Sequence, residues 1–174
     1  MKLRLKVFIG VSIISMFLFG GMVSAATDFT QFGFDRVVAE KHVKLGKSTK
    51  ISHSGIKIEI PEGAFEHEVL FQVLEGNDRK FQANAPTGEK VIMNFAFRVI
   101  DLETNEILGA FKKPVMFSYK DKDVNKGSIY YNVKTDGSFV NNNAASIING
   151  KTLSHPVGGA PVGWVITSPK WHDN

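Results

Sequence analysis

From His42 onward the chain consists of short stretches in which apolar and polar residues alternate, and turn-forming residues separate these stretches. Alternation of this kind puts apolar side chains on one face of a strand, because successive side chains of a strand point to opposite faces. Gly55–Ile60 has three isoleucines on one side, and Lys90–Ile100 has five apolar residues at alternate positions. The pattern predicts an all-β protein.

Further strands follow from the same alternation. The predicted ranges are His67–Leu74, Lys113–Lys120, Ser128–Lys134, Ser138–Val140, Ser146–Ile148, Lys151–Leu153 and Val162–Thr167. Asp136-Gly137 and Asn149-Gly150 favour tight hairpin turns, because both positions tolerate a positive φ. We expect a loop at Gly158, Gly159 and Pro161. These elements predict a single antiparallel β-sandwich of the Ig-like or Greek-key type, with about 8–10 strands.

The first 25 residues have the organisation of a secretory signal peptide. Three basic residues precede an apolar run from Val7 to Met22, and Val23 to Ala25 supplies a small-residue cleavage site. A membrane anchor is the alternative, since roughly 17–25 apolar residues can span a bilayer. The run is at the short end of that range and contains three glycines. We therefore expect cleavage after Ala25 or Ala26, a secreted, extracytoplasmic protein, and no stable membrane insertion after cleavage.

Charge and cysteine content narrow the classes of function. Removing 25 of the 174 residues leaves 149, the usual size of one domain. Three of the 21 basic residues lie in the removed part, so 18 remain against 17 acidic residues. This near balance predicts no nucleic-acid partner. The absence of cysteine fits a bacterial exported protein and excludes thiol nucleophiles and cysteine-based metal sites.

The mature chain divides into three expected parts. Residues 26–47 form a leader that packs as an edge strand or stays mobile, residues 48–168 form the sandwich, and residues 169–174 form a polar tail. The leader carries phenylalanines between Thr27 and Phe34. Such a segment could add as a strand to the open edge of a neighbouring molecule, which would make the protein a subunit of an extracellular assembly.

The order of short motifs resembles that of a known class of module. The segment "IPEGAF" is followed by "VLFQVLE", "VIMNFAFRVID", "FKKPVMFSY", "YYNVKTDGSFV" and "GWVITS". This order resembles bacterial extracytoplasmic β-sandwich modules, which are similar to the sandwich domain of ankyrins, netrin receptors and tight-junction scaffolds. The matching positions are Ile60, Pro61, Gly63, Ala64 and Phe111 to Val115. The resemblance covers roughly Lys50–Ser168, and it implies binding or scaffolding without a shared active site.

One loop has a spacing that suggests a metal. In "YKDKDVNKGSIYY", Asp121, Asp123 and Asn125 are spaced like the first three ligands of a calcium-binding loop. Glycine falls at the seventh position of this loop instead of the sixth, and Asn132 stands where a bidentate glutamate is required. The segment is also typical of a polar hairpin loop, with a weakly binding calcium site as the alternative. No other cofactor is predicted.

Catalytic signatures do not occur. The five histidines are scattered singly, without the HExxH spacing of a zinc protease, and no GxSxG nucleophile elbow is present. The sequence therefore predicts a protein that is not an enzyme.

Aromatic residues offer a further ligand class. Tyr130 and Trp171 are candidates for stacking on sugar rings, because aromatic faces bury apolar area while leaving polar edges wet. Trp164 alternates with Ile166 and is predicted to lie in the core. The leading hypothesis is a secreted, non-catalytic binding or cell-envelope structural module that uses its loops or sheet edges. A protein or a cell-envelope polysaccharide is the expected partner, and a carbohydrate-binding module is a further alternative.

Overall fold

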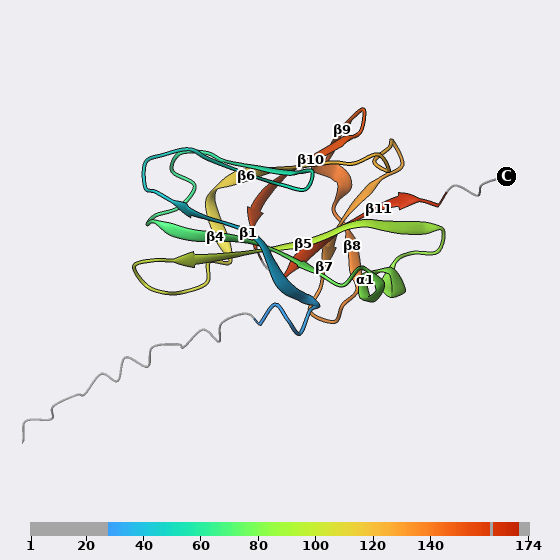
Figure 1. The fold of residues 1–174 in the computed structure, drawn as a ribbon, viewed down its shortest axis with the longest axis horizontal. Coiled ribbons are helices and arrows are strands. Elements are labelled where there is room, and N and C mark those ends of the chain that lie inside the picture. The colour runs from blue at the N-terminus through green and yellow to red at the C-terminus, as the bar shows by residue number, and fades with distance from the viewer. Residues whose placement is uncertain (1–27, 161, 171–174) are drawn as a thin grey trace, which may run out of the picture.

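The computed structural model describes residues 28–160 and 162–170, and Figure 1 shows its strands arranged in two layers. The strands form two antiparallel sheets, of six and five strands, packed against each other. The prediction of an all-β antiparallel sandwich is confirmed. The predicted signal peptide, residues 1–25, lies outside the described residues. No helix in the described part of the chain is long and apolar enough to cross a membrane.

The six-stranded sheet combines segments from both ends of the chain. Its strands, in spatial order, are β1 (Phe34–Val43), β4 (Val69–Gly76), β5 (Glu89–Asp101), β11 (Gly163–Pro169), β7 (Ile129–Val133) and β8 (Phe139–Asn141). β1 and β8 are therefore the edge strands of this sheet. β1 comes from the leader, residues 26–47, so part of the leader forms an edge strand. β1 pairs with β4 from Phe34 to Val43.

The five-stranded sheet covers the other side of the core. Its order is β2 (Thr49–His53), β3 (Ile56–Ile60), β6 (Ala110–Lys120), β10 (Thr152–Gly159) and β9 (Ile147–Asn149). The expected hairpin turns at Asp136-Gly137 and Asn149-Gly150 join β7 to β8 and β9 to β10, and both glycines have a positive φ. The loop expected at Gly158 and Gly159 is wrong, because β10 continues to Gly159 and pairs with β6 there.

The core between the sheets is rich in aromatic rings. Phe95 of β5 stacks on Phe117 of β6 with ring centroids 4.0 Å apart and an interplanar angle of 10°. The ring centroid of Trp164 in β11 lies 5.2 Å from that of Phe95. The side chain of Trp164 is buried, as predicted. The alternation seen in the sequence of β5 therefore points its aromatic residues at the facing sheet.

A second apolar cluster covers the outer face of the six-stranded sheet. Phe34 and Phe81 contribute rings whose centroids are 4.9 Å apart, and Phe29 is buried in the same cluster. Phe81 comes from α1 (Asp78–Asn84), a helix that the sequence did not predict and whose N-cap is Asn77. Because Phe29 and Phe34 are buried in their own chain, this part of the leader is already engaged.

The "IPEGAF" segment forms a corner that β6 holds in place. Gly63 has a φ of +74°, a conformation that costs glycine little and other residues more. The amide of Lys112 donates to the carbonyl of Ala64 at 3.0 Å, and Lys113 Nζ donates to the carbonyl of Glu62 at 2.8 Å. Phe65 is buried below the bend. The corner is therefore an architectural element that ties β3 to β6.

Replacing Gly163 by alanine should destabilise the fold, because a Cβ at this position would lie 2.4 Å from the ring of Phe34. Overpacking of this kind costs about 1–3 kcal/mol. Urea unfolding followed by tryptophan fluorescence should show a lower midpoint for Gly163→Ala.

The matched control is Gly158→Ala in β10, where a Cβ would meet no atom within 4 Å. Its free energy of unfolding should change by less than about 0.5 kcal/mol. Equal midpoints for the two variants would contradict the packing of Phe34 against β11.

Candidate functional site

One end of the sandwich carries a cavity of about 550 Å³. Several strands begin or end there, so segments that are distant in the sequence meet at its walls. The cavity is lined by Lys90, Lys122, Asp123, Asn125, Lys151, Ser168, Pro169 and Lys170. These residues come from the start of β5, the loop between β6 and β7, the turn between β9 and β10, and the end of β11. We call this cavity the lysine pocket.

The charges around the lysine pocket are predominantly positive. In the part of the chain that the structure describes, four lysines line it, against one carboxylate. Lys90 Nζ lies 2.9 Å from Asp123 Oδ2, and this contact lowers the pKa of the Asp123 carboxyl and raises the pKa of Lys90. Among the described residues, no carboxylate lies within 4.0 Å of the ammonium groups of the other three lysines. The pocket therefore has a net positive charge that its own aspartate does not balance.

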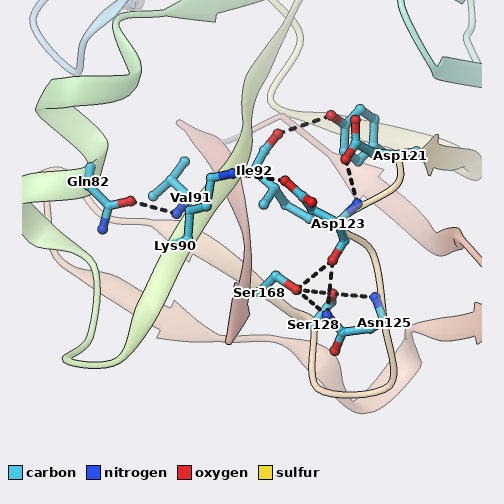
Figure 2. A network of polar contacts seen from close by, with 10 residues as sticks. Gln82, Lys90, Val91, Ile92, Asp121, Asp123, Asn125, Ser128 and Ser168 are labelled. Carbon is cyan, nitrogen blue, oxygen red and sulfur yellow. Dashed lines mark hydrogen bonds and ion pairs between the residues drawn. The ribbon is translucent and has the colours of Figure 1, made fainter. Parts of the chain in front are cut away.

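The loop between β6 and β7 is held in one conformation by its polar side chains. Figure 2 shows contacts that converge on Ser168 from Asp123, Asn125 and Ser128. Ser168 Oγ donates to the carbonyl of Asp123 at 2.7 Å and accepts from Asn125 Nδ2 at 2.6 Å. Val124 of the same loop is fully buried, which also holds the loop against the core. Because these bonds are internal, the loop presents a fixed wall to the pocket.

The proposed calcium ligands have other partners in this loop. Asp121 Oδ1 accepts the amide of Asp123 at 2.8 Å, and Asn125 Oδ1 accepts the amide of Gly127 at 2.8 Å (Figure 2 shows the first of these). Each is a side chain that bonds the backbone two residues on, which is a common reason for Asp and Asn in turns. No group of three or more His, Cys, Asp or Glu side chains among the described residues could hold a metal ion. Calcium binding at Asp121, Asp123 and Asn125 stays a prediction. A calcium ion at this place would be repelled by the neighbouring lysines.

The structure changes the set of candidate sugar-stacking aromatics. Tyr130 is fully buried in the core and its hydroxyl has no hydrogen-bond partner, so no face of its ring is open to a ligand. The prediction for Tyr130 is therefore corrected. Alternation along β7 suggested one buried and one exposed face. Both faces of the six-stranded sheet are covered by apolar clusters, so residues on either face of β7 can be buried. Trp171, the other candidate, lies outside the described residues.

His155 lies in the core, within hydrogen-bond distance of an asparagine and a serine. Its ring stacks on Tyr130 at a centroid distance of 3.9 Å, and burial lowers its pKa. Asn142 Nδ2 lies 3.4 Å from Nε2, and Ser146 Oγ lies 2.9 Å from Nδ1. With Asn142 as the donor, the neutral ring carries its proton on Nδ1 and donates to Ser146. A serine nucleophile needs the opposite direction, in which the imidazole accepts the hydroxyl proton.

His67 forms an ion-pair cluster at the opposite end of β5. Its Nδ1 lies 2.8 Å from Asp101 Oδ2 and its Nε2 lies 3.3 Å from Glu103 Oε2. The hydrogen bond that His67 donates to Asp101 is the main cause of the raised pKa of His67. Asp101 Oδ1 also accepts the amides of Glu103 and Thr104, so this carboxylate organises the turn after β5. Stabilisation of the turn after β5 therefore accounts for the presence of these three charged side chains.

The His67 cluster should make stability depend on pH. Because the folded pKa of His67 is raised above 6.5, its contribution is complete below about pH 6.5 and is lost as the pH rises through the folded pKa. Histidine Cε1 proton shifts measured by NMR should therefore give a His67 midpoint above the ordinary histidine pKa.

The matched variant is Asp101→Asn, in which Oδ1 can still accept the two turn amides while the negative charge is gone. Its His67 midpoint should fall toward 6.5. The same midpoint in both proteins would show that Asp101 does not control the protonation of His67.

Comparison with known proteins adds no family assignment. No protein-family model matches the chain, and no curated protein matches it. The resemblance noted from the "IPEGAF" motif order therefore stays a prediction.

Proposed function

We propose that this protein is an exported, non-catalytic binding module that holds an anionic ligand in the lysine pocket. The observation that carries the proposal is the composition of the pocket, in which four lysines from four separate segments face one aspartate. The expected signal peptide supports export. The module class follows the leading sequence hypothesis, with the loop end of the sandwich as its binding surface.

The electrostatics of the pocket favour an anion over a cation. Asp123, the only carboxylate among the described residues of the lining, is paired with Lys90. A cation would have to displace that ammonium group and would still face three further lysines. An anion instead gains from every lysine, and it leaves the internal hydrogen bonds of the loop intact.

Two features support a non-catalytic role. His155 is buried and stacked on Tyr130, and with Asn142 as the donor to Nε2 its ring donates to Ser146, the direction opposite to that of a general base. His67 is tied to two carboxylates in a turn that it helps to stabilise. Neither histidine belongs to the lining of the lysine pocket. The anion is therefore expected to be bound and released unchanged.

The other candidate functions gain less from the structure. Strand addition by the leader would require Phe29 and Phe34 to leave the cluster in which they are buried. Carbohydrate stacking loses Tyr130 as a candidate. The lysine pocket needs no such rearrangement, because its walls are already in place.

The test is calorimetric titration of the full chain with inorganic tripolyphosphate. We expect binding that weakens as salt is added, since screening reduces the attraction between exposed charges. Lys151→Glu should weaken binding by about tenfold or more, because a hydrogen bond to a charged group is worth about 1.5–3 kcal/mol. Lys122→Glu should act in the same direction.

The matched control is Lys134→Glu, which makes the same charge change beyond the other end of β7 and outside the pocket lining. It should leave the affinity within about threefold of the unaltered protein. Absence of tripolyphosphate binding, or equal losses in Lys151→Glu and Lys134→Glu, would overturn the proposal. Calcium is titrated separately in the same buffer. Calcium binding without tripolyphosphate binding would support the competing assignment, a cation site at Asp121, Asp123 and Asn125.

A further inference from the structure

Positive charge continues from the lysine pocket onto the outer face of the five-stranded sheet. Lys151 in the pocket is followed by Thr152, which opposes Lys120 across the β10–β6 pair. Lys120 is exposed, whereas its neighbour Tyr119 points into the core. Lys120 therefore carries the charge of the pocket onto β6.

The next lysine on this face is Lys57 of β3. Ser118 opposes Lys57, and Lys120 lies two residues further along β6 on the same face as Ser118. Diagonal neighbours of this kind in a sheet lie about 7–8 Å apart. Lys57 is exposed between two buried isoleucines, so its side chain lies on the outer face.

Beyond Lys57 the charge falls and a second cavity begins. Glu59 Oε1 lies 2.7 Å from Lys57 Nζ and 3.4 Å from Lys50 Nζ, so these three side chains together carry one positive charge. Lys50 and Glu59 also line a cavity of about 360 Å³ with Pro61, Pro114 and Met116. The strands from β10 to β2 span on the order of 15 Å, since neighbouring strands lie about 4.8 Å apart.

Small hydroxyl side chains lie between these lysines. Ser118 and Ser154 oppose each other on the outer face, with their Oγ atoms 2.8 Å apart, and Ser52 opposes Lys57 on the next strand. Serine can donate or accept a hydrogen bond without blocking the surface. The surface between the lysine pocket and the second cavity therefore has short polar side chains and a net positive charge.

We infer that the ligand of the lysine pocket is the end of a linear chain of repeated phosphate groups, which continues across β10, β6 and β3. This inference rests on the proposed function, since it extends the same pocket. A single small anion would occupy the pocket alone and would not use Lys120 or Lys57. A chain that emerges from the pocket meets both lysines on its way across the sheet.

The residue types on this path suit a chain of phosphate groups and differ from those of a nucleic-acid site. The cations are lysines, whose compact ammonium groups bind phosphate as point charges. Proteins that hold single-stranded nucleic acid also supply aromatic faces on which bases stack. Tyr119 on β6 is buried, and the outward residues beside Lys120 and Lys57 have no aromatic ring: they are Ser52, Glu59, Ser118 and Thr152.

The test compares a short and a long phosphate probe on the full chain. Tripolyphosphate should occupy the pocket only, and long-chain inorganic polyphosphate should also reach Lys120 and Lys57. The affinity for the long probe should therefore fall more steeply with salt, because each phosphate contact releases counterions. A Lys57→Ala, Lys120→Ala double variant should reduce the slope by about two and weaken long-probe binding by roughly three- to tenfold. Its affinity for tripolyphosphate should not change.

The outcomes separate this inference from the proposed function. If the double variant binds long polyphosphate like the unaltered protein while Lys151→Glu still weakens tripolyphosphate, the chain inference is overturned and the pocket remains. If tripolyphosphate does not bind at all, the proposed function fails. Equal affinity for polyglutamate, or tighter binding of a single-stranded oligonucleotide with the same charge, would overturn the assignment to a phosphate chain without bases. Circular dichroism and the unfolding midpoint of the double variant show that its fold is retained.

Discussion

The stack of Phe95 on Phe117 is the contact on which the rest of the structure depends. It joins β5 to β6 across the interior, and Tyr130 and Trp164 bring β7 and β11 to the same group of rings. His155 adds β10, because its ring stacks on Tyr130. The strands that meet in these rings are also those whose ends and loops form the lysine pocket. Since a close-packed core resists small displacements, the rings fix the relative positions of the pocket walls.

Much of the fold could be predicted from alternation, and the parts that could not have physical reasons. β5 was recognisable because one face of its sequence holds the core aromatics. β1 was ambiguous because register shifts after Phe34 and Val37 break the period of two. α1 was missed because its seven residues bury only Phe81, which leaves no helical pattern to detect.

The candidate site illustrates a different limit of sequence reasoning. The spacing of Asp121, Asp123 and Asn125 located the loop between β6 and β7, which is one wall of the pocket. It could not reveal Lys90, Lys151 and Lys170, because these lysines arrive from other segments only when the sandwich is folded. The near balance of charge outside residues 1–25 also hides them, since the lysines are offset in the total by acidic residues at other places, such as Asp101 and Glu103 of the His67 cluster.

The most direct measurement of the central claim is a map of backbone amide shifts by NMR during titration with tripolyphosphate and then with long polyphosphate. We expect the short probe to shift the amides of Lys90, Lys122, Lys151 and Lys170, and the long probe to shift those of Lys120 and Lys57 as well. Shifts that cluster on β1 and β4, or no shifts with either probe, would contradict the assignment of an anionic ligand to the lysine pocket.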